Sequence, residues 1–130
     1  MLFRSVPEFV RACEVSASKV IRAFTFRVVE RMKVSFAQAK SGRVYRVSRT
    51  GRPHQASAPG EAPAILTGFL SNSILTAFPG PRVGEITIGA QYAPYLEQGT
   101  RTIAPRPYIR PAIKGTLDEF AKPGVIGGLL

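Results

Sequence analysis

Few residues in this chain have side chains that could carry out catalysis or bind a metal. The 130 residues include one His, one Cys and eight carboxylates. His54 lies in a basic, proline-containing stretch, which favours a surface or interface role over that of a general base. Cys13 lies on an apolar helical stripe and is expected to be a small buried residue rather than a reactive thiol. We therefore expect no catalytic residue and no metal site, and predict that the chain is not an enzyme.

The glycines do not have the spacing of a phosphate-binding loop. The segment 57–61 lacks both the Lys-Ser/Thr pair of a P-loop and the G-x-G-x-x-G pattern of a dinucleotide site. We therefore expect no nucleotide and no other cofactor.

Basic residues are concentrated in the first half of the chain. Residues 1–60 contain 12 Lys/Arg and 3 Glu, whereas residues 61–130 contain 6 Lys/Arg and 5 acids. Four arginines follow one another closely: Arg43, Arg46, Arg49 and Arg52. They could contact DNA phosphates or an acidic protein, and only Tyr45 interleaves with them as a stacking aromatic. A basic nucleic-acid-binding module is therefore the alternative hypothesis, although no recognition motif accompanies the charge.

An acid and two arginines could connect the last two helices that the sequence predicts. Glu97 is the acid nearest in sequence to Arg106 and Arg110. We expect Glu97 to pair with one of these arginines within the chain, with an intersubunit pair as the alternative. Pro111 is expected to push Arg110 toward an extended backbone.

The N-terminal third is expected to be one long amphipathic helix. Ser5 can cap it, with Glu8 bonding back and Pro7 in the first turn. Apolar residues then recur with a period close to 3.6 at Val10, Cys13, Ala17, Val20, Ile21, Phe24, Val28 and Met32. A helix that runs to about Ala39 would be roughly 50 Å long, which exceeds a small globule. It must therefore bend, within 24–29, or pack part of its stripe on a neighbouring subunit.

The rest of the chain predicts a small antiparallel sheet and short helices. Alternation indicates a half-buried strand at 43–47, and residues 48–63 lack any period and are expected to be a long loop. A short helix capped by Thr67 should follow, then a strand at 74–78, a turn at 79–81 and a strand at 83–89.

The C-terminal part should contain two helices and an arm. Pro94 and Gly99 predict a two-turn helix over 92–98, with Gly99 as a left-handed terminator. A final helix is expected over 107–120. We thus predict an α+β fold in a single domain, 1–122, and a C-terminal arm, 123–130, outside the core.

The chain is expected to be made in the cytosol. No continuous apolar stretch reaches the length of a signal peptide or a membrane span, so no membrane contact is expected. A single Cys cannot form an internal disulfide, which fits a reducing compartment.

Four segments, in this order and spacing, resemble the tail-completion (neck, head–tail joining) family of long-tailed phages and prophages. They are residues 51–63, 67–74, 92–100 and 106–112, and the resemblance covers about residues 40–113. It departs from the family at Gln98, where members commonly have an aromatic residue, and in the C-terminal arm.

The resemblance implies an α+β subunit that forms a ring, usually a hexamer, in the virion at the head-proximal end of the tail. Such a subunit is assembled in the host cytoplasm and has no known catalytic site. Its implied partners are other copies of itself, neighbouring neck proteins, the tail tube protein and, in passing, the packaged DNA. Besides the arginines, His54 and Glu97 named above, we expect Tyr92 and Tyr95 at contacts, and structural roles for Gly99, Pro107 and Pro111.

Overall fold

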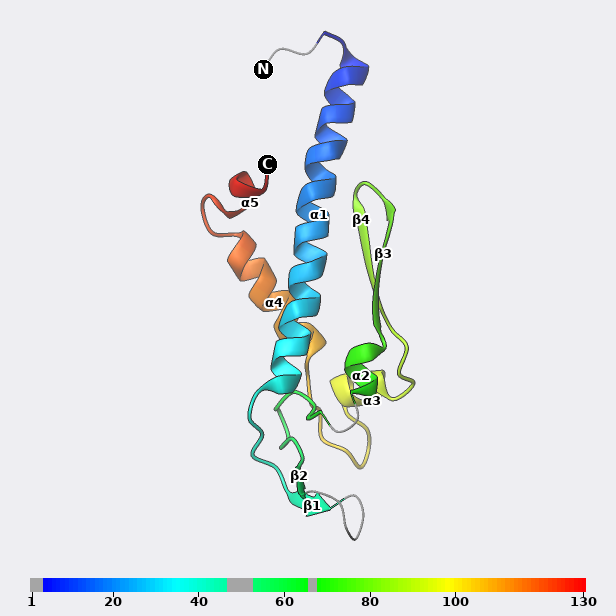
Figure 1. The fold of residues 1–130 in the computed structure, drawn as a ribbon, viewed down its shortest axis with the longest axis vertical. Coiled ribbons are helices and arrows are strands. Elements are labelled where there is room, and N and C mark those ends of the chain that lie inside the picture. Colours follow the sequence, from blue (N-terminus) through cyan, green and yellow to red (C-terminus); the bar gives the residue numbers. More distant parts are fainter. Residues whose placement is uncertain (1–3, 47–52, 66–67) are drawn as a thin grey trace.

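The computed structural model describes residues 4–46, 53–65 and 68–130 and has an α+β fold, as predicted. One long helix, α1, runs along the longest axis of the molecule (Figure 1). Two separate two-stranded antiparallel sheets and four short helices accompany it in these residues.

Helix α1 spans Val6–Ala37 and begins as the sequence predicts. The Ser5 hydroxyl accepts a hydrogen bond from the Glu8 backbone N–H at 3.3 Å. The Glu8 carboxylate reaches back to the N–H of Arg4, at 2.7 Å, rather than to that of Ser5. The helix is continuous through 24–29, so the bend expected there is absent.

Burial on α1 is restricted to its C-terminal half. Thr25, Val28, Met32 and Phe36 are buried, because α4 and the second sheet pack on this half. The first turns of α1 extend beyond its neighbours in Figure 1. Cys13 is therefore exposed, and the expectation that it is buried was wrong.

The first sheet pairs β1, Val44–Arg46, with β2, Pro53–Gln55, in the register Tyr45↔His54. The region 48–63, which was expected to be a loop, thus contains the strand β2. A strand of three residues is too short to show an alternating pattern in the sequence. All three residues of β1 are exposed, so this strand is not half-buried. Residues 47–52, including Arg49 and Arg52, lie outside the described part of the chain.

The second sheet is the predicted hairpin, made of β3, Ile74–Gly80, and β4, Val83–Ile88. Ile86 and Ile88 pack against the core from one face of β4, as the alternation indicated. Helix α2, Phe69–Asn72, precedes β3 and has Gly68 at its N-cap, while the expected cap, Thr67, is not among the described residues.

The C-terminal region contains α3, Ala93–Gln98, then α4, Ile109–Phe120, and α5, Val125–Leu129. Because α4 begins at Ile109, Arg110 is helical, which corrects the extended backbone expected before Pro111. The segment expected as an arm forms the one-turn helix α5 beside α1 and α4, and none of its residues is buried.

A small apolar core joins these elements around the C-terminal half of α1. Among the described residues its buried members are Val28, Met32, Phe36, Ile74, Ala90, Ala93, Tyr108 and Ala112. They come from α1, β3, the segment before α3, α3 itself and the start of α4. The core therefore lies where β3, α3 and the start of α4 meet α1.

Candidate functional site

Parts of the chain that are distant in sequence meet in one place, which we call the junction (residues 56–61, 69–72, 92–99 and 103–112). The Gly60 N–H donates to the Pro105 carbonyl at 3.0 Å. The ring centroids of Phe69 and Tyr92 are 6.2 Å apart. The junction is thus one structural unit built from all four segments.

Glu97 caps helix α4 from a different element. Its carboxylate accepts the backbone N–H groups of Tyr108, Ile109 and Arg110 at 2.7, 2.9 and 3.0 Å. The first four N–H groups of a helix lack partners within the helix, and here the fourth position is Pro111, which has no N–H. Every unpaired donor at the start of α4 is thereby satisfied.

The expected ion pair between Glu97 and an arginine does not form. In the described residues, Glu97 makes no ion pair, and its oxygens are occupied by the α4 backbone. Arg106 instead directs its guanidinium to the Ser57 carbonyl, at 3.2 and 3.3 Å, and to the Ala104 carbonyl. Glu97 does tie α3 to α4, as predicted, but through backbone hydrogen bonds.

Gly99 ends α3 with the positive φ that was predicted, 76°, but not in the left-handed conformation that was expected with it. Its ψ of 173° places it outside the left-handed helical region, in a region that is essentially restricted to glycine. A Cβ at this position would lie 2.9 Å from the Ile103 carbonyl oxygen and from the Pro105 ring. The turn after α3 therefore requires glycine for both its backbone angles and its close packing.

Tyr108 anchors the junction to α1. It is 1% exposed, its ring centroid lies 5.3 Å from that of Phe36, and its hydroxyl donates to the Ala93 carbonyl at 3.3 Å. Burial, and then the nearby Glu97 carboxylate, raise the pKa of Tyr108 to about 12. Tyr108 is thus a neutral buried side chain, and sequence reasoning did not single it out.

A groove of about 500 Å³ opens beside the junction. Its lining includes the aromatic side chains of Phe36, Tyr45, Phe69 and Tyr92, together with aliphatic and small residues. His54 also lines it and packs edge-on against Tyr45, with ring centroids 5.5 Å apart. Tyr95 is 59% exposed and lies at an adjoining hollow.

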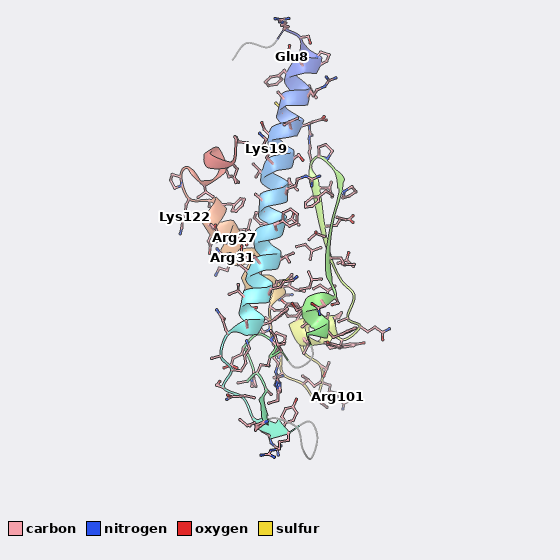
Figure 2. All side chains as sticks on the ribbon, viewed as in Figure 1. Glu8, Lys19, Arg27, Arg31, Arg101 and Lys122 are labelled. Atoms are coloured by element: carbon pink, nitrogen blue, oxygen red, sulfur yellow. The ribbon has the colours of Figure 1, made fainter. Side chains whose placement is uncertain are left out.

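Among the described basic residues, Arg106 lines this groove, and the others do not converge on it. Arg43 and Arg46 are exposed at the first sheet, at the end of the molecule opposite the N-terminus (Figure 1). Lys40 is used internally, because its ammonium donates to the Ser35 carbonyl at 2.6 Å, and burial lowers its pKa. Figure 2 shows further cations spread along the molecule, from Lys19 to Arg101.

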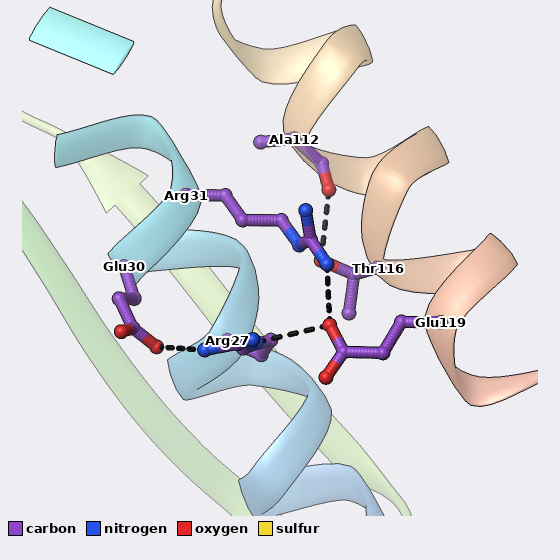
Figure 3. A network of polar contacts seen from close by, with 6 residues as sticks. All are labelled: Arg27, Glu30, Arg31, Ala112, Thr116 and Glu119. Carbon is purple, nitrogen blue, oxygen red and sulfur yellow. Dashed lines mark hydrogen bonds and ion pairs between the residues drawn. The ribbon is translucent and has the colours of Figure 1, made fainter. Parts of the chain in front are cut away.

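Two carboxylates that sequence reasoning missed hold elements together. Glu119 of α4 binds Arg27, at 3.0 Å, and Arg31 of α1 (Figure 3). The hydrogen bond from Arg27, followed by that from Arg31, lowers the pKa of Glu119. Arg27 also pairs with Glu30 at 2.7 Å. These contacts fix α4 on α1.

Glu61 forms the other connection. It accepts the Ser41 hydroxyl, the Ser41 N–H at 3.1 Å and the Ala58 N–H at 2.9 Å. These bonds, the one from the Ser41 hydroxyl first, lower the pKa of Glu61 to about 2. The segment after α1 is thereby held against the turn at 58–61.

Neither a metal cluster nor a membrane helix is found in the residues that the structure describes. No group of three or more His, Cys, Asp or Glu side chains could hold an ion there. No helix in that part combines the length and the apolar character that a membrane span needs.

Comparison with known proteins found no matching family model, no matching curated protein and no matching solved structure.

Proposed function

We propose that this chain is a structural, non-enzymatic subunit of a phage head–tail connector, a tail-completion or tail-terminator protein that forms a ring, usually a hexamer in the family it resembles. The ring would join the capsid neck to the tail tube within the virion. Its partners would be copies of itself, neighbouring neck proteins and the tail tube protein, with packaged DNA in passing contact.

The observation that carries this proposal is the apolar surface left uncovered on an elongated chain with a small core. Large apolar residues are exposed at several separate places, including Val6 at 74%, Leu75 at 64% and Leu117 at 55%. Subunits of an assembly cover such residues when they associate, and the core of an interface is more apolar than the rest of a protein surface. Several separate patches on one chain suit the heterologous contacts from which rings are built.

The use of polar side chains at the junction also supports a structural role. Glu97 and Arg106 are committed to backbone groups, and Tyr108 is buried and neutral. None of the three is positioned as an acid, base or nucleophile toward an open site. The segments that resemble the family would therefore serve to build the subunit.

The mass of the protein in solution tests this proposal. We expect light scattering to give a ring-sized particle, alone or after addition of tail tube protein, and negative-stain images to show rings. A monomer at all concentrations, with and without tail tube protein, would overturn the proposal.

A nucleic-acid-binding role is the second candidate. Arg43 and Arg46 are exposed at the first sheet, and the chain has a net charge of +10. The variant that replaces Arg43, Arg46, Arg49 and Arg52 by Gln separates the two candidates. If these residues contact phosphates, DNA affinity falls, and the slope of log affinity against log salt flattens by about 0.9 per lost contact. Intact rings together with lost DNA binding would favour DNA binding as the role of these arginines.

A further inference from the structure

The N-terminal half of α1 has the residue spacing of a helix that packs along another helix. Small or apolar residues follow at alternating steps of four and three: Val6, Val10, Cys13, Ala17, Val20 and Phe24. We call this row the seam. A strict alternation of this kind is the a/d repeat of a coiled coil, and it extends over roughly 28 Å of helix.

The lower end of the seam is already a helix–helix interface. Phe24 packs edge-on against Phe120 of α4, with ring centroids 5.2 Å apart. The next two positions of the same row, Arg27 and Arg31, bind Glu119 of α4. The seam is thus continuous with the contact between α1 and α4, and it runs on past the end of α4.

The upper end of the seam is uncovered in the chain. Val10 is 43% exposed, Val6 is 74% exposed, and Cys13 is also exposed. Ala17 and Val20 are half-buried. The exposed fraction of the side chains in this row is therefore highest toward the N-terminus of α1.

The low net charge of this stretch allows a second copy to be its occupant. Residues 6–24 have three basic and two acidic side chains, a net charge of +1, whereas the whole chain has +10. Two copies would repel one another over most of their surface, but little along this helix. The seam is also flanked by mostly uncharged residues, such as Pro7, Ser16 and Ala23, which widens its apolar face.

We propose that the uncovered upper end of the seam, from Val6 to Cys13, packs side by side against the same segment of a second copy, placing the two Cys13 side chains next to one another across the contact. This inference rests on the proposed function for the presence of several copies. The contact joins one patch to the same patch, so it pairs two copies and is separate from the heterologous contacts around the ring. A helix with the same repeat matches the uncovered part of the seam, and the second copy supplies one.

The single cysteine makes the contact measurable in the unmodified chain. Packed helices lie about 8–10 Å apart, so a short bismaleimide should join Cys13 to Cys13. We expect a covalent dimer on a denaturing gel at concentrations where the protein assembles. The Cys13→Ser variant should give none.

Two matched substitutions show whether the dimer depends on the seam. Val10→Glu should lower the dimer yield at least about tenfold, because packing would take the new carboxylate out of water. Val15→Glu is the control, since Val15 is 53% exposed in the same turns but lies about 140° around the helix from Val10. It should leave the yield unchanged, and far-UV circular dichroism should show that both variants remain helical.

The outcomes separate this inference from the proposed function. Assembled particles without a Cys13 dimer, or equal yields from Val10→Glu and Val15→Glu, would overturn the seam contact and leave the ring proposal standing. A further outcome would also overturn the seam contact: Cys13 reacts freely with the maleimide in the protein alone and is protected from it only when tail tube protein is added. The occupant would then be another protein. A seam-dependent dimer that never grows into a larger particle would support the seam and count against the ring.

Discussion

At the scale of single residues, carboxylates in this chain act as acceptors for backbone N–H groups. Glu97 receives three N–H groups at the start of α4, and Glu61 receives two together with a hydroxyl. A carboxylate at a helix N-terminus also interacts favourably with the helix dipole. Glu97, for which the sequence suggested an ion pair, and Glu61 therefore connect elements of the fold through hydrogen bonds from backbone N–H groups.

We expect Glu97→Ala to destabilise the protein by about 1–3 kcal/mol, because it leaves three backbone donors of α4 without their acceptor. Gln98→Ala is the matched control, since Gln98 is exposed on the same helix. Denaturant unfolding followed by circular dichroism measures the difference. Equal midpoints for the two variants would show that water replaces the carboxylate at little cost.

The lowered pKa of Glu61 predicts a pH dependence of stability. The native pKa of about 2 lies below the ordinary value of 4.5, so ionised Glu61 stabilises the fold above about pH 4.5. This contribution is lost as the pH falls toward 2. Glu61→Gln should therefore be less stable than the natural chain at pH 6, and the gap should close between about pH 5 and pH 2. Unfolding midpoints across this range decide it, and a constant gap would contradict the assignment.

At the scale of elements, the hairpin of β3 and β4 lies close against α1 because Gly84 has no side chain. A Cβ on Gly84 would overlap the Thr25 hydroxyl and approach Ile21 Cγ2 at 3.2 Å. Thr25 is itself 5% exposed and donates to the Ile21 carbonyl at 2.8 Å. The hairpin therefore approaches α1 closely at Gly84.

Gly84→Ala should cost about 1–3 kcal/mol of stability, because the added methyl pushes the hairpin away from α1. Gly80→Ala in the same hairpin provides the control, as a Cβ there meets nothing within 4 Å. Thermal or urea unfolding of both variants measures the effect. A loss of similar size in both would assign it to the strand backbone rather than to helix packing.

At the scale of the whole molecule, an elongated chain with net charge +10 must overcome repulsion in order to assemble. Salt screens that repulsion, with a Debye length of about 10 Å at 0.1 M, and does not weaken apolar contacts. DNA binding responds in the opposite way, because it is driven by counterion release.

We therefore expect the assembled fraction to hold or rise when NaCl is increased from about 50 to about 300 mM. Over the same range, any DNA binding should fall steeply. Light scattering and a gel-shift assay on one preparation measure both quantities. Particles that dissociate as salt rises would indicate that charge pairs, rather than the uncovered apolar surface, hold the subunits together.

The sequence by itself determined the features that depend on neighbouring residues. The Ser5 cap, the long amphipathic helix, the hairpin of β3 and β4, and the positive φ of Gly99 all follow from local spacing and from the conformational limits of each residue type. The α+β class followed from these elements. The strand β2 was missed, because three residues give no usable period.

Only the tertiary structure decided which partners the polar and apolar residues find. Sequence proximity suggested an arginine for Glu97, but the fold brings the unpaired N–H groups of α4 to it. The stripe of α1 is periodic along its length, yet only the half that α4 and the hairpin cover is buried, so Cys13 is exposed. Periodicity shows that a face can be buried, whereas burial itself depends on whether another element reaches that face.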